Sequence, residues 1–391
     1  MEVTQIYEIM NNVTNAVLGK TDLVKEDLSN IVTVGDEIFN ARAVDNYVAE
    51  LVDHIGKVIF VNRPYRGSVP SVLMDGWEFG SVLEKIRADI PEAEENESWK
   101  LEDRKSYDPN IFYKPKVSVK FFNNKSSFQV PMSFTRMQVK ESFSNVEQLN
   151  GFLSMLYDSV DKSMTIKMDS LVRMTINSMT AQTLFAEYAT AQYGSSSGVR
   201  AVNLLLLYNQ RYGKTLAAEE AVTDPDFIRF AAYEIGVYSS RLTQLSTLFN
   251  IGNTAKFTPK DLQHVVMLDV FVKATEVFLQ SNTYHETLVN LPNAEVVPYW
   301  QSSGTRYDFD DISGIDVTIA KEGGGTQDVA ATGILAVIFD RDALGVTNLN
   351  RRVESNYNPV AEFYSNWHKF DAGYFNDLNE NFVVFFVADP T

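Results

Sequence analysis

The segment PKVSVKFFNNKSSFQVPMSF, residues 115–134, alternates apolar and polar side chains along two runs. The apolar positions are Val117, Val119 and Phe121 in the first run and Phe128, Val130, Met132 and Phe134 in the second. A period of two is typical of β-strands that bury one face, and Lys120, Gln129 and Ser133 occupy the other face. The polar residues Asn123-Asn124-Lys125 between the runs predict that the two strands pair with each other as a β-hairpin.

This hairpin lies inside a longer extended region, residues 60–140, that has little apolar area of its own to form a core. The acidic run Pro91-Glu-Ala-Glu-Glu-Asn-Glu97 at its centre is typical of a solvated tip. Residues 1–56 contain short amphipathic helices, with Ile6 and Ile9 at helical spacing. Because neither region can bury its apolar residues alone, we expect both to pack on neighbouring subunits.

After the hairpin the sequence becomes helical. Ser144-Asn-Val-Glu147 is a capping box, and apolar residues follow at spacings of three and four as far as Met179. From Asn145 to Gln192 there is no proline and only one glycine, Gly151. A continuous helix over this length is about 70 Å long. Because a strict heptad is absent, we predict a spine that crosses a domain and not a coiled coil.

The remainder of the chain alternates short strands and helices. Asp224-Pro225 predicts a helix start, with Asp as N-cap and Pro in the first turn. Short apolar strands are predicted at 262–268, 295–300 and 333–339, with a helix at 272–279 between the first two. Residues 353–387 are rich in Tyr, Phe and Trp and are predicted to be β. Together these patterns indicate an α+β protein in which a compact α/β unit follows the long helix.

Composition excludes several classes of protein. The 391 residues carry a net charge of −17 and no cysteine, and 45% of them are hydrophobic. A chain this acidic is repelled by phosphate backbones, and a chain without cysteine has neither disulfides nor thiolate sites. The N-terminus lacks the features of a secretory signal, and no apolar run approaches the ~20 residues of a membrane span. We therefore expect a protein of a cytoplasm-like compartment with no membrane partner.

Three patterns suggest chemistry only weakly. Gly194-Ser-Ser-Ser-Gly198 fits the GxSxG nucleophile elbow with Ser196 as nucleophile, but that motif needs a strand before the turn, whereas a helical pattern precedes it here. Gly323-Gly-Gly325 lacks the surroundings of a phosphate loop and predicts a turn. The four histidines, at 54, 264, 285 and 368, show no metal-binding spacing, and His264 is expected to be a hydrogen-bonded core residue. We expect no catalytic site, no metal and no cofactor.

The order of the parts points to a known family. The segments that carry the likeness are YVAELVDHIGKVIF (47–60), SVLEKIRADI (81–90), the stretch 115–134, GILAVIFDRDALGV (333–346) and NRRVESNYNPVAEFYSNWHKFDAGYF (350–375). In this order the chain resembles the major capsid proteins of tailed bacteriophages with the HK97 fold, and within them the podovirus proteins of the phi29 type. It departs from the phi29 type in that no immunoglobulin-like domain is expected after Thr391.

The resemblance implies a domain plan. Residues 1–56 correspond to the N-terminal arm, 57–140 to the E-loop and its flanking strands, 141–200 to the spine helix of the P-domain, 201–349 to the A-domain, and 350–391 to the C-terminal strands of the P-domain. It also implies a structural protein and not an enzyme. Such subunits self-assemble into hexamers and pentamers of an icosahedral shell, in the cytoplasm of a bacterial host, and remain in the virion around double-stranded DNA.

The implied partners are further copies of the chain, a separate scaffolding protein, a portal and minor head proteins, with DNA enclosed but not bound by sequence. For assembly contacts we predict apolar or acidic residues of the two extensions: Ile6, Ile9, Glu92, Glu94, Glu95, Glu97, Trp99, Phe121 and Phe128. Two alternatives remain open at this point. One is an encapsulin-like cellular compartment with the same architecture, and the other is a serine hydrolase that uses Ser196.

Overall fold

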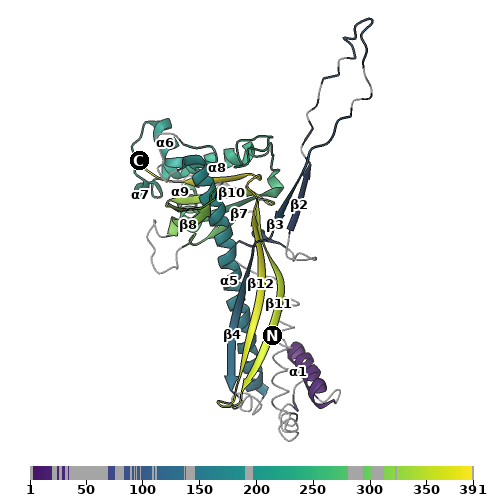
Figure 1. Ribbon diagram of the computed structural model, residues 1–391. Helices are drawn as coiled ribbons and strands as arrows, with labels where there is room; N and C mark the ends of the chain where they lie inside the picture. Colours follow the sequence, from purple (N-terminus) through teal and green to yellow (C-terminus); the bar gives the residue numbers. More distant parts are fainter. Residues whose placement is uncertain are drawn as a thin grey trace.

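The computed structural model describes residues 3–19, 24–25, 29–30, 34, 69–74, 83–88, 90–91, 93, 95–96, 98–107, 110, 112–135, 137, 146–189, 197–280, 294–301, 312–321 and 324–389. Figure 1 shows three parts: a long helix beside a long twisted sheet, an α/β unit at one end of that helix, and a strand pair whose connecting loop extends far from both. The N-terminal helix α1 (Val3–Leu18) lies near the end of the long sheet that is remote from the α/β unit.

The long sheet is built from segments far apart in the chain. β4 (Lys125–Thr135), β11 (Leu344–Asn358) and β12 (Phe363–Asn376) pair antiparallel, and β1 (Leu73–Met74) joins β11 in parallel. The strand order is β1-β11-β12-β4. Along β4 the side chains alternate between exposed and at least partly buried, which confirms the predicted one-sided burial of this strand.

α5 (Val146–Tyr188) packs along this sheet (Figure 1). Its 43 residues span about 64 Å at 1.5 Å per residue, so the predicted spine helix is confirmed. Its buried residues recur at spacings of three and four and face the core: Val160, Met164, Met168, Leu171, Val172, Ile176 and Met179. This periodicity explains why the helix keeps one face against the sheet over so many turns.

The α/β unit holds a five-stranded sheet between two helical layers. Its strands, in the order β5-β13-β10-β6-β7, are Ala201–Asn203, Phe382–Phe386, Ile334–Asp340, Gln263–Leu268 and Ala294–Val297. The helices around it are α6 (Leu204–Tyr212), α7 (Ala218–Ala221), α8 (Pro225–Arg241) and α9 (Asp269–Gln280). One face of the sheet shares a core with α5, and the other shares a core with α6 and α8. Every residue of β10 is buried, as expected of a central strand covered on both faces.

The predicted hairpin within residues 115–134 is wrong, although both of its segments are strands. β3 (Val117–Phe122) pairs with β2 (Leu83–Ala88), and β4 pairs with β12 along its whole length. The connecting residue Asn124 accepts a hydrogen bond from Tyr374 N (3.1 Å) instead of closing a turn between β3 and β4. The chain leaves the long sheet between the two segments: all eleven residues of β4 pair with β12 at the edge of that sheet, whereas β3 pairs with β2 in a separate two-stranded sheet.

Most of the other expected elements are confirmed. The strands at 262–268 and 333–339 and the helix at 272–279 are present, and Asp224 caps α8 by accepting a bond from Phe227 N (2.7 Å). The strand predicted at 295–300 ends at Val297, because Pro298 has no N–H to donate. Two residues of the glycine run, Gly324 and Gly325, have positive φ and lie in the predicted turn, which joins β8 (Ile315–Ala320) to β9 (Thr326–Ala331).

Two buried histidines are expected to make the fold less stable in acid. Burial lowers the pKa of His368 in β12, whose side chain is 2% exposed, and burial together with Arg341 lowers that of His264 in β6. Neither ring nitrogen of His264 has a hydrogen-bond partner within the described residues, which corrects the expectation of a hydrogen-bonded core histidine. Both side chains are therefore neutral in the folded chain at neutral pH.

We predict that the unassembled chain loses stability as the pH falls below about 6.5, where the unfolded chain takes up protons that the folded chain cannot bind until lower pH. His368→Gln removes one of the two groups, so its urea midpoint should fall less steeply than that of the wild type between about pH 7 and pH 5. Equal slopes for the two proteins would show that His368 does not contribute.

Candidate assembly surface

The strand pair β2–β3 presents its apolar side to solvent. On the outer face Ile86 lies directly opposite Val119, and Phe121 follows two residues along. The exposed fractions of these side chains are 66%, 44% and 65%. The inner face, which carries Lys85, Lys120 and other partly buried residues, lies against the body of the subunit. A strand pair of an isolated soluble domain normally has the opposite arrangement, with apolar side chains inward.

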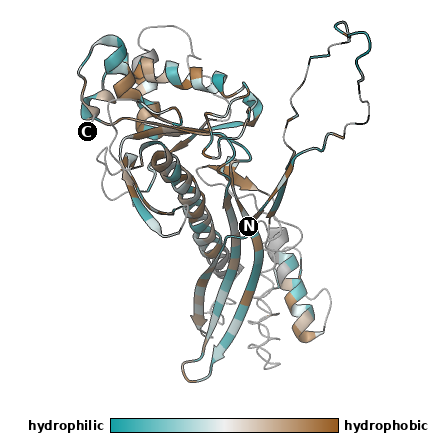
Figure 2. Ribbon diagram, turned by 45° about the horizontal axis from the view of Figure 1, so that its top comes forward, coloured by the Kyte–Doolittle hydropathy of each residue, from teal (hydrophilic) through white to brown (hydrophobic). Residues whose placement is uncertain are grey.

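The loop that connects the two strands continues this apolar surface. We call residues 83–122 the arm, and Figures 1 and 2 both show its loop standing clear of the remaining chain. Its described large side chains are at least 48% exposed: Ile90, Trp99, Leu101, Tyr107, Phe112 and Tyr113. Exposed apolar surface on this scale is unusual in a soluble monomer and marks sites of protein–protein contact.

The inner face fixes the arm to the body. The rings of Phe122 and Phe375 lie 5.0 Å apart, and the Arg87 guanidinium donates to the carbonyl oxygen of Ala255 (3.1 Å). Within the body, Ser71 donates to Glu295 through both its backbone N–H (3.0 Å) and its hydroxyl (2.5 Å). Burial raises the pKa of Glu295, and these two hydrogen bonds partly offset that rise. The arm is therefore held to the body at its base and carries exposed apolar side chains beyond it.

The structure separates the contact residues predicted from the sequence. Trp99 (74% exposed), Phe121 and Glu95 lie on the exposed surface of the arm. Phe128 instead faces its own subunit, where its ring lies 5.2 Å from that of Phe370, because β4 belongs to the long sheet. The others lie outside the described residues or have side chains that do: Ile6, Ile9, Glu92, Glu94 and Glu97. Sequence reasoning missed Ile86 and Phe112, which are as exposed as the residues it named.

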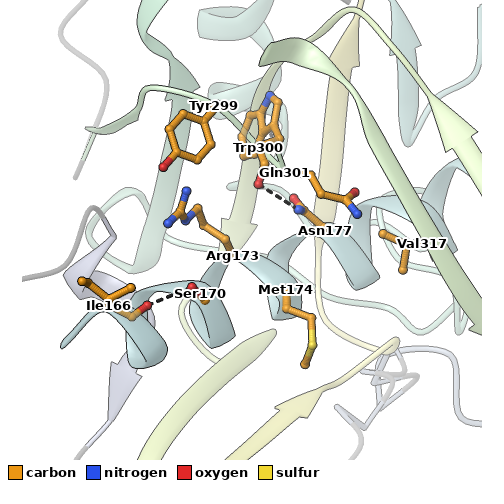
Figure 3. Close-up of a pocket in the computed structure, with 9 residues that line it drawn as sticks. All are labelled: Ile166, Ser170, Arg173, Met174, Asn177, Tyr299, Trp300, Gln301 and Val317. Atoms are coloured by element: carbon orange, nitrogen blue, oxygen red, sulfur yellow. Dashed lines mark hydrogen bonds between the residues drawn. The ribbon is translucent and has the colours of Figure 1, made fainter. Parts of the chain in front are cut away.

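A groove on the spine helix is a second candidate site. Its volume is about 370 Å³, and α5, the segment Tyr299–Gln301 and Val317 of β8 line it (Figure 3). Arg173 stacks on the Tyr299 ring at 4.7 Å and pairs with Asp169 at 2.7 Å. Asn177 donates to Trp300 O (3.0 Å). These contacts bind the α/β unit to the spine. The lining contains no histidine, and the Ser170 hydroxyl donates to Ile166 O (2.8 Å), so the groove offers no activated nucleophile.

The hydrolase alternative gains no support from the motif at 194–198. Ser196 lies outside the described residues, but the elements around it are known: α5 precedes the motif and β5 follows it. This order is the reverse of the strand–turn–helix that a nucleophile elbow requires. Ser197 accepts a hydrogen bond from Asn203 N (2.9 Å) and so braces the start of α6.

Two further findings concern the described part of the chain alone. None of its helices combines the length and the apolar character needed to cross a bilayer. No three of its histidine, aspartate or glutamate side chains gather as a metal site.

The long helix on a long sheet, the α/β unit and the projecting arm together match solved shell proteins. The capsid structure of Staphylococcus phage Andhra aligns with a TM-score of 0.50 at 10% identity, over 84% of this chain and 86% of that one. The capsid of Cyanophage P-SCSP1u aligns with a TM-score of 0.45 at 12% identity, over 84% and 91%. None of the curated protein sequences compared with this chain matches it. The Andhra match shows the HK97-like fold of tailed-phage capsid subunits.

The sequence narrows this class. The model of the family described as Phi29-like phage major capsid protein matches residues 9–386, which is nearly the whole chain. The chain therefore belongs to that family, and its role is structural: it associates with itself to form the shell of a phage virion. The resemblance inferred from the sequence is confirmed, and the encapsulin-like and hydrolase alternatives are not favoured.

Proposed function

We propose that the arm is the element that joins subunits, and that its outer face lies on a neighbouring copy of the chain within hexamers and pentamers of an icosahedral shell. The observation that carries this proposal is the orientation of β2–β3, in which Ile86, Val119 and Phe121 face solvent while the lysines face the body. A subunit with this arrangement gains stability from its apolar arm only when another protein covers it. Glu95 of the acidic run is exposed on the same arm.

We propose for this chain the domain plan that the family resemblance implies. We assign residues 1–56 to the N-terminal arm, 57–140 to the E-loop and its flanking strands, 141–200 to the spine helix, 201–349 to the A-domain and 350–391 to the C-terminal strands of the P-domain. Two pairings refine this plan: β4 is a flanking strand that completes the long sheet, and β13 returns to the five-stranded sheet of the A-domain. The closing segment therefore ties the two domains together.

The proposed contents and partners of the shell follow from charge and class. A chain with a net charge of −17 encloses double-stranded DNA without binding it tightly, since a basic wall would hold phosphates in place. We assign assembly to the bacterial cytoplasm, with a scaffolding protein, a portal and minor head proteins as the other participants, and we assign no catalytic activity to the chain.

The proposal predicts that Val119→Thr with Phe121→Thr abolishes shell assembly without unfolding the subunit. Threonine keeps the β-propensity of the strand, and both side chains already face solvent, so stability should change by less than about 0.5 kcal/mol. Loss of two apolar contacts in every subunit should lower association by at least about 100-fold. Sedimentation and electron microscopy would measure the particles, and a urea titration the stability.

The matched control is Glu84→Gln, which lies on the same outer face and removes no apolar area. We expect it to assemble as the wild type does. Normal shells from the double threonine variant would contradict the proposal that this face makes the contact.

A further inference from the structure

Two lysines stand opposite each other at the base of the arm. In the register of β2 and β3, Lys85 is the direct partner of Lys120, and like charges at this position destabilise an antiparallel pair. One carboxylate resolves the conflict: Asp377 Oδ2 lies 2.9 Å from Lys85 Nζ, and Asp377 Oδ1 lies 2.8 Å from Lys120 Nζ. Each oxygen of a single acid on the body thus binds one strand of the arm.

A second acid extends this cluster. Glu380 Oε1 lies 2.7 Å from Lys85 Nζ and 2.7 Å from Lys256 Nζ. The side chains of Asp377 and Glu380 are only 3% and 4% exposed. We call these five residues, Lys85, Lys120, Lys256, Asp377 and Glu380, the lysine clamp. It joins both strands of the arm to the 377–381 loop between β12 and β13.

The body holds the two acids in fixed positions. Asp377 N donates to Ala343 O (2.7 Å), and Asn379 N donates to Asp377 Oδ1 (3.1 Å). Burial alone would raise the pKa of Asp377, but the hydrogen bonds from Lys120 and Lys85 outweigh it and hold that pKa below its ordinary value. Burial alone would lower the pKa of Lys85, but the hydrogen bonds and charges of Glu380 and Asp377 have the larger effect and raise it above its ordinary value. Both partners therefore keep their charge at neutral pH.

Within the described residues, the arm also contacts the body through Phe122 on Phe375 and through Arg87 at Thr254 and Ala255, while its outer apolar face is turned away from the body. A change of 10° at its base would move the end of a six-residue strand of about 20 Å by about 3.5 Å, which is close to the whole range of an apolar contact. Hydrogen bonds between charged groups are strong and directional. The clamp is thus placed where a small change of angle decides which position a neighbouring subunit takes.

We propose that Lys85 and Lys120 are positioning residues, which set the angle between arm and body through Asp377 and Glu380 and thereby determine the curvature and size of the shell. This inference rests on the proposed function, in which the outer face of the arm contacts a neighbour. In this role the lysines act by orienting the apolar face that makes the contact.

The test uses the full-length Lys85→Met/Lys120→Met variant, expressed under the conditions in which the wild-type chain forms shells. Methionine keeps an unbranched apolar side chain and removes the charge. Because the outer face is intact, we expect folded subunits that still associate, but into sheets, tubes or particles of mixed diameter. Losing hydrogen bonds between charged groups should reduce particles of the wild-type diameter by about tenfold or more. Electron microscopy measures the diameters.

Lys85→Arg/Lys120→Arg keeps both charges and should restore most of the wild-type diameter. If the double methionine variant does not fold, the single variant Lys120→Met serves as the test. Lys120 is the more exposed of the two lysines, at 38%, so its replacement should disturb folding less. Wild-type diameters from a folded methionine variant would overturn the inference. So would folded subunits that do not associate at all, since the lysines would then be needed for contact and not for angle.

The two proposals fail separately. If the clamp variants form normal shells while Val119→Thr/Phe121→Thr does not assemble, only the positioning role is wrong. If the threonine variant assembles normally, the proposed function of the arm is wrong, whatever the clamp variants do.

Discussion

A chain that lacks residues 91–113, with Ile90 joined to Lys114 by a short Gly-Ser linker, is expected to fold and to lose shell assembly. The deletion removes five large side chains that are between 48% and 83% exposed: Trp99, Leu101, Tyr107, Phe112 and Tyr113. Burying one such side chain contributes about 1.5–3 kcal/mol, and each 1.4 kcal/mol changes an association constant by about tenfold. Losing the burial of even two of them lowers association by at least about 100-fold.

Folding should survive the deletion because the anchor of the arm lies outside it. The β2–β3 register, the Phe122–Phe375 contact and the ion pairs of the lysine clamp are all retained. Circular dichroism and a urea titration of the subunit check this expectation, and light scattering with electron microscopy measures assembly. Shells of normal size from the deleted chain would show that the loop of the arm is dispensable.

A matched variant separates charge from apolar area. Replacing Glu92, Glu94, Glu95 and Glu97 by glutamine keeps the length of the loop and all its apolar residues. If the apolar side chains dominate the contact, this variant assembles far better than the deletion. If instead it fails equally, the acidic run makes the contact, as the sequence also suggested.

Local patterns predicted the elements of this fold well. The spine helix follows from helically spaced apolar residues and a stretch without proline, and β10 follows from a continuous apolar run. The cap of α8 follows from Asp224 and Pro225. All of these signals lie within one element, and each depends on contacts a few residues apart.

Pairing between distant segments was not predictable in the same way. Val117–Phe121 and Phe128–Phe134 show the same apolar alternation, yet the first run faces solvent and the second faces the core. The difference arises because β12, more than 200 residues further along the chain, pairs with β4 and not with β3. The residues of the 115–134 segment do not show which distant strand each run pairs with. Their pattern alone therefore predicted a hairpin.

Contacts between distant polar residues, such as those of the lysine clamp, were equally unpredictable from the sequence. Its members lie at positions 85, 120, 256, 377 and 380, and a lone lysine or aspartate in a sequence is most often a solvated surface residue. Only the register of β2 and β3 reveals that Lys85 and Lys120 are opposed and need a shared acid. The family resemblance was enough to predict the class of the protein from its sequence. The lysine clamp could be found only in the structure.

Gly333→Ala is expected to destabilise the subunit itself and so to prevent assembly by a different route. Gly333 has a φ of +73°, where side chains other than glycine are strained by about 1–3 kcal/mol. A Cβ at this position would also lie 2.0 Å from the carbonyl oxygen of Val387. That distance is far below van der Waals contact, so the backbone must move. The movement would disturb the bonds from Val387 N to Gly333 O (2.8 Å) and from Gly333 N to Ser313 Oγ (3.0 Å).

Gly324→Ala is the matched control, because Gly324 also has a positive φ, +100°, but no atom lies within 4 Å of its added Cβ. The control therefore carries only the backbone strain, and Gly333→Ala should lower the urea midpoint clearly more than Gly324→Ala does. Gly333 immediately precedes β10, where Ile334 pairs with Phe386 of β13, a strand in the interior of the five-stranded sheet. Its substitution should therefore yield unfolded or aggregated subunits, whereas the arm variants yield folded ones. Equal midpoints for the two alanine variants would show that the backbone at Gly333 relaxes at little cost and that the end of the chain is not tightly held there.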